Sequence, residues 1–235
     1  MAEERKGRGA GLSREKVLAA ALAVADAEGL EAVSFRRLAS DLGVTPMALY
    51  RYGDDKEALL DGIGDLVLSQ LELPEPPTGD WREQLRAAAR SYRVVLGAHP
   101  GSVPIFLSRP LMTPARMRAA NAVLGIFRRA GFSTEQAVPL YQHFSRVMLA
   151  HVMLETEAGA DLTSKKRQEQ ARLARITFET LPAEEFPYLV EAAAQLGAPH
   201  DPERAFATGL DLLIAGLELQ RPAAQSNAST RRARR

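Results

Sequence analysis

Apolar residues along most of the chain recur every three or four positions, which is the spacing of one buried face of an α-helix. The pattern begins after Ser13, a favourable N-cap residue, and continues to Gln220. No segment alternates apolar and polar residues for long enough to build a sheet. The pattern therefore predicts an all-α fold of about ten helices. They are expected over residues 14–28, 35–42, 46–52, 56–73, 81–98, 114–130, 133–157, 165–181, 184–196 and 202–219.

Proline, glycine and capping residues mark where these helices begin and end. The clearest break is LPEPPTGD at residues 73–80, because three prolines and a glycine cannot continue a helix. Asp80 then caps the helix that starts at Trp81. Ser133 with Gln136 three residues later is a capping box. Residues 103–107 are expected to form only a short turn, and residues 159–163 a loop.

Two interruptions within four residues distinguish the segment LASDLGVTPMALYRYGDDKEALLD, residues 38–61. Gly43 supplies the backbone freedom for a tight reversal. Thr45 caps the next helix and Pro46 occupies its first turn, where no backbone donor is lost. With the small Ala39 and the apolar Leu49, this is the spacing of a helix-turn-helix, which presents its second helix to a DNA groove.

The same spacing also fits an ordinary helical corner, so the flanking residues decide between the two interpretations. Arg36, Arg37 and Arg51 lie on the unit against a single acid, Asp41, between residues 34 and 52. Lys56 begins a further helix, whose amino end attracts phosphate. This charge distribution favours DNA binding.

The segment GLEAVSFRRLASDLGVTPMALYRYGDDKEALLDGI closely resembles the N-terminal domain of the TetR (Tet-repressor) family of bacterial transcriptional regulators. The signature GV-x-x-x-x-LY-x-[HY]-x-x-[DN]K-x-x-L is present from Gly43 to Leu59. The resemblance implies a three-helix DNA-binding domain in which Tyr50 and Lys56 contact phosphate. For Met47 and Tyr52 two roles stay open, contact with DNA and packing within the domain. The DNA-contacting set that it implies is Ser34, Arg36, Thr45, Pro46, Met47, Ala48, Tyr50, Arg51 and Lys56.

The second half resembles, more loosely, the C-terminal domain of tetracycline-repressor-like members of the family. The similar stretches include SYRVVLGAHPG, LSRP, AGFSTEQAV and MLAHVMLE. The resemblance implies a homodimer formed by helices 133–157 and 202–219, with an internal core helix as the alternative for the apolar stripe Phe206, Leu210, Leu213, Ile214 and Leu217. It also implies a small-molecule pocket, for which the candidates are Tyr92, Phe106, Arg109, Pro110, Met117, Asn121, Tyr141, Phe144 and Met148. Plain core packing is the alternative for Phe106, Met117, Phe144 and Met148.

Two positions depart from the tetracycline repressors. Where these have a histidine that helps to hold the magnesium of the drug complex, this chain has Ile105, and a second pocket histidine corresponds to Glu72. Isoleucine cannot ligate a metal. The four histidines are scattered, and His143 and His151 are too far apart in sequence for a zinc pair. We expect an effector other than magnesium–tetracycline, no metal and no cofactor.

Composition and charge restrict the protein class further. The 235 residues carry a net charge of +1 and include no cysteine, which suits a reducing cytoplasm and excludes a thiol nucleophile. No apolar run approaches the roughly 20 residues of a membrane span, and the polar start predicts no signal peptide. We therefore expect a soluble, cytoplasmic protein. The arginines among the last residues have two alternative roles: they contact the phosphate backbone of DNA, or they only make a disordered tail soluble.

The sequence thus predicts four parts: a flexible basic arm (1–12), a helix-turn-helix domain (13–60), a helical ligand-binding and dimerisation domain (61–220) and a disordered basic tail (221–235). The leading hypothesis is a homodimeric repressor that binds a palindromic operator and is released by an unidentified small-molecule effector. A helix-turn-helix regulator controlled by a protein partner, with no small ligand, is the main alternative. An all-helical enzyme is remote, because no nucleophile–base pair, carboxylate pair or phosphate loop stands out.

Overall fold

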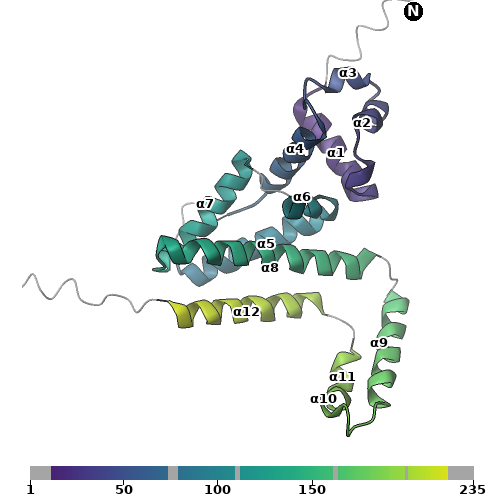
Figure 1. Ribbon diagram of the computed structural model, residues 1–235, viewed down its shortest axis with the longest axis vertical. Coiled ribbons are helices and arrows are strands. Elements are labelled where there is room, and N and C mark those ends of the chain that lie inside the picture. The colour runs from purple at the N-terminus through teal and green to yellow at the C-terminus, as the bar shows by residue number, and fades with distance from the viewer. Residues whose placement is uncertain (1–11, 74–78, 109–111, 161–163, 199–200, 222–235) are drawn as a thin grey trace, which may run out of the picture. The chain divides into compact units, whose positions relative to one another are not determined.

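The computed structural model describes residues 12–73, 79–108, 112–160, 164–198 and 201–221. These residues form helices and short turns, with no strand among them, which confirms the all-α prediction (Figure 1). The helices are α1 (Arg14–Glu28), η1 (Leu30–Ala32), α2 (Phe35–Asp41), α3 (Pro46–Leu49), α4 (Lys56–Leu68), α5 (Trp81–Ala98), η2 (Pro100–Ser102), α6 (Val103–Ser108), α7 (Pro114–Arg129), α8 (Thr134–Ala160), α9 (Ser164–Glu179), α10 (Pro187–Glu191), α11 (Ala193–Leu196) and α12 (Pro202–Gln220).

Four elements differ from the sequence prediction. The helix expected over 56–73 is α4, which ends at Leu68. The expected turn at 103–107 is the helix α6, because Val103, Ile105 and Phe106 are all buried against the rest of the fold. The single helix expected over 184–196 is two short helices, α10 and α11, separated at Ala192. α8 continues through Gly159 to Ala160, where a loop was expected. The other three differences reflect tertiary packing or a tolerated glycine that local pattern does not reveal.

Capping interactions fix most helix starts where the sequence placed them. Ser13 and Asp80 accept backbone N–H groups at the starts of α1 and α5. Ser133 and Gln136 form the reciprocal capping box before α8, with the Ser133 amide 2.9 Å from the Gln136 side-chain oxygen. Because each cap satisfies amides that the helix itself leaves unpaired, it sets the first residue of its helix.

The contacts between residues divide the chain into two compact units. The first is formed by the described parts of residues 1–153 and 213–235, and the second by residues 154–212. In the first unit α4 packs against α1 and α7, and α5 packs against α7. Its core includes the fully buried rings of Phe127, Phe132 and Phe144. The predicted boundary near residue 60 falls inside α4, and the arm before residue 12 and the tail after 221 lie outside the described residues.

α1 and η2 approach each other closely at one glycine. A Cβ atom at Gly101 would lie 2.0 Å from the Ala25 carbonyl oxygen, so only glycine fits there. The Asp26 carboxylate accepts the Gly101 amide at 3.2 Å and contacts His99 Nδ1 at 2.8 Å. This joint attaches the last turn of α1 to the segment that follows α5.

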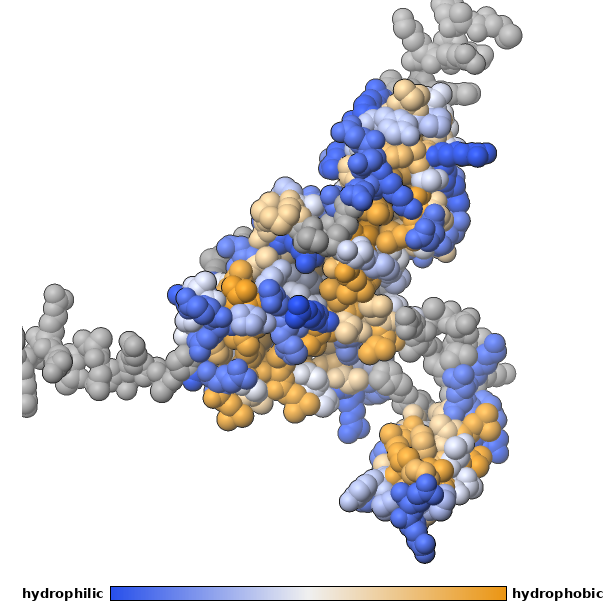
Figure 2. Space-filling model, viewed as in Figure 1, coloured by the Kyte–Doolittle hydropathy of each residue, from blue (hydrophilic) through white to orange (hydrophobic). Residues whose placement is uncertain are grey.

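In the second unit α9 packs against α10 and α11. Its surface retains large exposed apolar side chains, and Figure 2 shows an apolar patch over these helices. They are Leu173, Ile176, Tyr188, Leu189 and Leu196. An exposed apolar patch of this kind marks an interaction surface.

The apolar stripe of α12 is covered within the single chain. Phe206, Leu210, Ile214 and Leu217 are buried, and Leu213 is half-buried. The internal-core alternative therefore describes this stripe, and a second copy would have to contact other residues of α12. Leu212 and Leu219 are such residues, since 70% and 89% of their surface is exposed.

Candidate nucleic-acid interface and effector cavity

A tight turn joins α2 and α3. Gly43 adopts φ 65°, and the Val44 amide donates to the Ala39 carbonyl at 2.9 Å. Leu38 and Leu49 are fully buried beneath the turn. The turn therefore holds the short helix α3 at a fixed angle over a small core, at the end of the domain far from α5 and α7 (Figure 1).

The outer face of α3 is open to solvent. Thr45, Pro46 and Met47 are exposed, with 77% of the Met47 surface accessible. Thr45 precedes the helix as N-cap, but its side chain makes no capping hydrogen bond. Its hydroxyl and methyl groups and the Met47 side chain are thus exposed, and they are groups of the kind that contact base edges in a major groove.

Two tyrosines beside α3 have different environments. Tyr50 is partly exposed and its ring stacks on Phe35 with centroids 4.6 Å apart. Tyr52 is half-buried, and its hydroxyl donates to the Leu12 carbonyl at 2.7 Å. Tyr52 therefore packs inside the domain, whereas Tyr50 keeps an edge toward solvent.

The arginines of this unit also separate into two groups. Arg37 donates to Glu28 at 2.7 Å and to Asp41 at 2.9 Å. This hydrogen bond from Arg37 lowers the pKa of the Glu28 carboxyl below its ordinary value. Arg37 is thus neutralised within the protein. Arg36 and Arg51 are exposed, and the Arg51 guanidinium lies 4.9 Å from the centre of the Tyr52 ring.

The start of α4 adds a further cation. Lys56 is exposed in the first turn, next to α3 in sequence. Asp55 is the N-cap and accepts the Ala58 amide at 2.7 Å, so one of the free amides is already occupied. Lys56, Arg36 and Arg51 are exposed cations suited to a phosphate backbone, although the exposed acids Asp54, Asp55 and Glu57 flank Lys56.

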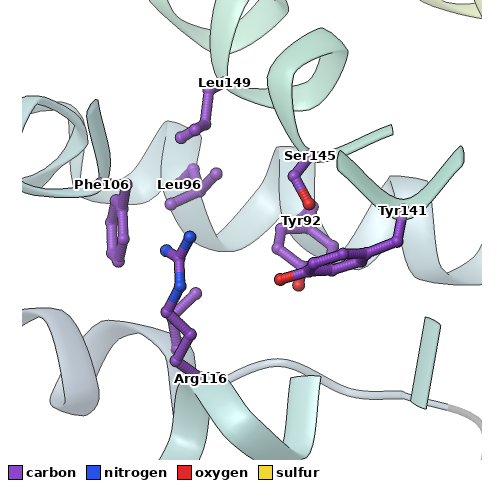
Figure 3. A pocket seen from close by; sticks show the side chains of 8 residues that line it. Tyr92, Leu96, Phe106, Arg116, Tyr141, Ser145 and Leu149 are labelled. Carbon is purple, nitrogen blue, oxygen red and sulfur yellow. The ribbon is translucent and has the colours of Figure 1, made fainter. Parts of the chain in front are cut away.

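A small cavity lies in the first unit between α5, α6, α7, α8 and the last residue of α4. Its volume is about 20 Å³. Its walls are mostly apolar, and Figure 3 shows Arg116 rising between Phe106 on one side and Tyr92 and Tyr141 on the other. The lining residues are Leu68, Tyr92, Leu96, Phe106, Arg116, Tyr141, Ser145 and Leu149.

Two family models match the chain and cover both parts of it. Residues 17–63 match "Bacterial regulatory proteins, tetR family", and residues 73–221 match "Tetracyclin repressor-like, C-terminal domain". The chain belongs to the TetR family. It is accordingly a TetR-family transcriptional regulator with a helix-turn-helix domain and a ligand-binding C-terminal domain.

Individual relatives agree with this assignment. The chain is 31% identical over 212 residues to the tetracycline repressor protein class C of Escherichia coli, covering 89% of this chain and 92% of that protein. It is 38% identical over 128 residues to the HTH-type transcriptional repressor DrrR1 of Streptomyces coeruleorubidus, which is 54% of this chain but only 47% of that relative. The TetR-family protein ActR of Streptomyces coelicolor, solved in complex with actinorhodin, superposes with a TM-score of 0.80 at 30% identity, covering 91% of this chain and all of that one.

The cavity of this TetR-family chain brings together three of the residues predicted for the pocket, namely Tyr92, Phe106 and Tyr141. Phe144 packs edge-on against Tyr92, with the two ring centroids 5.8 Å apart, and Met148 is buried. Met117 and Asn121 point elsewhere, because both are exposed and neither lines the cavity. Arg109 and Pro110 lie outside the described residues.

Sequence reasoning missed Arg116, the one charged residue among the described residues that line the cavity. Its signal was available, since Arg116 follows Pro114 within the first turn of α7, where a side chain faces back toward the preceding segment. Residue type alone does not separate Arg116 from Arg118, because both are arginines of α7. Only the structure shows that Arg116 is half-buried and Arg118 exposed.

Two further features concern metals and membranes. Ile105, in the place of the magnesium-binding histidine, is buried. Within the described ranges, no group of three histidine, aspartate or glutamate side chains is arranged to hold a metal ion. No helix in that part of the chain has the length and apolar character needed to cross a membrane.

Proposed function

We propose that the protein is a homodimeric repressor that binds a palindromic operator through α2 and α3 and is released when a small molecule enters the cavity of Tyr92 and Arg116. The DNA-contacting residues are Ser34, Arg36, Thr45, Pro46, Met47, Ala48, Tyr50, Arg51 and Lys56. Of these, Ser34 caps α2 by accepting the Arg37 amide, so it acts mainly through the placement of that helix.

The observation that carries the proposal is the position of α4. Its first residue, Lys56, follows the recognition unit, and its last residue, Leu68, lines the cavity. A helix of this length spans about 20 Å. Since a packed helix moves as a body, a displacement of Leu68 by a ligand would be transmitted to α3.

A second contact ties α4 to the cavity. Asp65 Oδ1 of α4 accepts the Ala115 amide at 2.7 Å, and the next residue along α7 is Arg116. A ligand that moves Arg116 would therefore pull on α4 through one hydrogen bond as well as through Leu68. In a dimer, such a movement changes the separation of the two recognition helices, which must match half-sites about 34–36 Å apart.

Exposed apolar side chains support the homodimer. Leu154 near the end of α8 and Leu212 and Leu219 on α12 are mostly exposed in the single chain. Large apolar side chains on two long helices are suited to pack against their symmetry mates in an isologous interface. α8 and α12 are the helices that the resemblance to tetracycline repressors implies for dimerisation.

The size of the cavity favours a second candidate, a regulator controlled by a protein partner without a small ligand. A volume of about 20 Å³ holds a water molecule, whereas ligand pockets typically measure about 300–1,000 Å³. The candidates separate when the low-molecular-mass fraction of a cell extract is added to the purified protein on its operator. Release by that fraction supports the small-molecule effector, and release only by the protein fraction supports the second candidate.

DNA binding is tested with Tyr50→Ala and Lys56→Ala in gel shifts on an operator located by genomic footprinting. Both substitutions should weaken binding similarly on different DNA sequences, because they remove phosphate contacts. Lys56→Ala should also reduce the dependence of log affinity on log salt by about one. Arg172→Ala is the matched control, since Arg172 is an exposed arginine of α9, outside the recognition unit. Unchanged affinity and salt dependence in both test variants would refute the assigned interface.

A further inference from the structure

We infer, on the basis of the proposed function, that the effector is an aromatic molecule carrying an acidic group, and that Arg116 binds the acid. The inference rests on a guanidinium with no acidic partner among the described residues, two phenol groups and an aromatic wall that meet in one cavity.

Arg116 is fixed at its backbone and free at its end. The Ala115 amide donates a hydrogen bond to Asp65 Oδ1, and the Arg116 amide donates one to Thr113 Oγ1, with a nitrogen–oxygen distance of 3.5 Å. These caps anchor the first turn of α7, so the side chain leaves a defined point and extends into the cavity (Figure 3). The arginine is therefore a built part of the cavity wall and not a surface residue that happens to lie near it.

The guanidinium has no acidic partner in the part of the chain that the structure describes. No ion pair joins Arg116 to a described aspartate or glutamate, and none of the described residues that line the cavity is acidic. A partly buried cation without a counter-charge is costly, and arginine prefers a planar, two-oxygen partner. A carboxylate or an ionised phenol on the ligand would supply that partner.

The two tyrosines complement this charge. The hydroxyl of Tyr141 is turned toward Arg116 (Figure 3), and Tyr92 lines the same cavity. Burial raises the pKa of the Tyr92 hydroxyl, Tyr141 raises it further, and Arg116 acts in the opposite direction. Tyr92 thus remains a neutral phenol that can donate a hydrogen bond to an oxygen of the ligand.

The remaining walls select for an aromatic body. Phe106 faces the two tyrosine rings across the space that Arg116 occupies, and Leu96 and Leu149 close it (Figure 3). Flat rings stack or pack edge-on between such walls. The cavity volume is about 20 Å³, so an aromatic ligand requires the Arg116 side chain, which extends between these walls in Figure 3, to move aside. Since the arginine side chain is long and flexible, an entering ligand can push it aside while the acidic group of the ligand pairs with the guanidinium.

The test uses a matched pair of probes, anthraquinone-2-carboxylate and anthraquinone-2-carboxamide, which share one ring system and differ in charge. Isothermal titration calorimetry on the DNA-free protein gives both dissociation constants. The carboxylate should bind at least about tenfold more tightly than the amide, because a charge-assisted, bidentate contact is stronger than a neutral one. Arg116→Gln should abolish this preference, and Arg116→Lys should restore part of it. Arg118→Gln, which removes a charge two residues away, should leave the preference intact.

Each outcome bears on the inference. Equal affinities for the two probes in the wild-type protein, no binding of either probe, or an undiminished preference in Arg116→Gln would overturn it. Thermal melts show whether each variant is folded. If Arg116→Gln does not fold, the test relies on Arg116→Lys, which should keep only part of the preference for the carboxylate. A gel shift without probe tests DNA binding separately. A protein that binds its operator but does not distinguish the probes disproves only the ligand class, whereas loss of operator binding disproves the proposed function.

Discussion

Gly101→Ala should separate α1 from η2. The added Cβ atom would lie 2.0 Å from the Ala25 carbonyl oxygen, 2.3 Å from the Ala25 carbonyl carbon and 2.7 Å from the Asp26 amide nitrogen. All three are backbone atoms, so no side-chain rotation relieves the clash. Because real Cβ contacts are essentially never below 3.0 Å, the last turn of α1 must move by at least 1.0 Å, the difference between 3.0 and 2.0 Å.

The expected cost follows from the bonds at this joint. A shift of this size breaks the bond from the Gly101 amide to Asp26, which is already 3.2 Å long, and strains the His99–Asp26 contact. Overpacking costs about 1–3 kcal/mol, and loss of a hydrogen bond to a carboxylate costs about 1.5–3 kcal/mol. A total near 3 kcal/mol would lower the melting temperature of a chain of this size by roughly 6–12 °C.

Thermal unfolding followed by circular dichroism measures this change. Gly97→Ala is the matched control, because Gly97 lies in the last turns of α5 and its added Cβ would meet nothing within 4 Å. Alanine favours the helix by up to about 1 kcal/mol, so the control should melt at or slightly above the wild-type temperature. A Gly101→Ala protein that melts within about 1 °C of the wild type would refute the argument from close approach.

Two further changes test the ionic and capping contacts. Hydrogen bonding from Arg37 places the pKa of Glu28 below its ordinary value of 4.5 in the folded chain. The stabilisation is therefore present above pH 4.5 and lost as the pH falls through the folded value. The melting temperature should fall less between pH 6 and pH 3 in Glu28→Gln than in the wild type. An equal fall of the melting temperature in both proteins would contradict this. Asp65→Ala should cost about 1–2 kcal/mol in urea unfolding because the Ala115 amide loses its acceptor, whereas Asp65→Asn, which keeps an acceptor oxygen, should cost clearly less; equal costs would remove the assigned role.

The sequence by itself determined the helical class, most helix starts and the recognition unit. These depend on interactions within a few residues. Gly43 takes a positive φ because the turn requires it, and Ser13, Asp80 and Ser133 cap the helices that follow them. Local chemistry also placed Pro46 in the first turn of α3. Such signals are short-range, so the order of residues is enough to locate them.

The tertiary structure alone decided which residues meet from distant parts of the chain. Arg37 carries the same charge as Arg36, yet it pairs with Asp41 four residues later and with Glu28 nine residues earlier, whereas Arg36 stays exposed. Arg116 lines the cavity while Met117 and Asn121 do not, because the rotation of α7 depends on its packing against α4 and α5. The stripe of α12 is covered inside one chain, although its apolar spacing is equally typical of a dimer face. Periodicity gives the apolar face of a helix, but the partner of that face is set by contacts far apart in sequence.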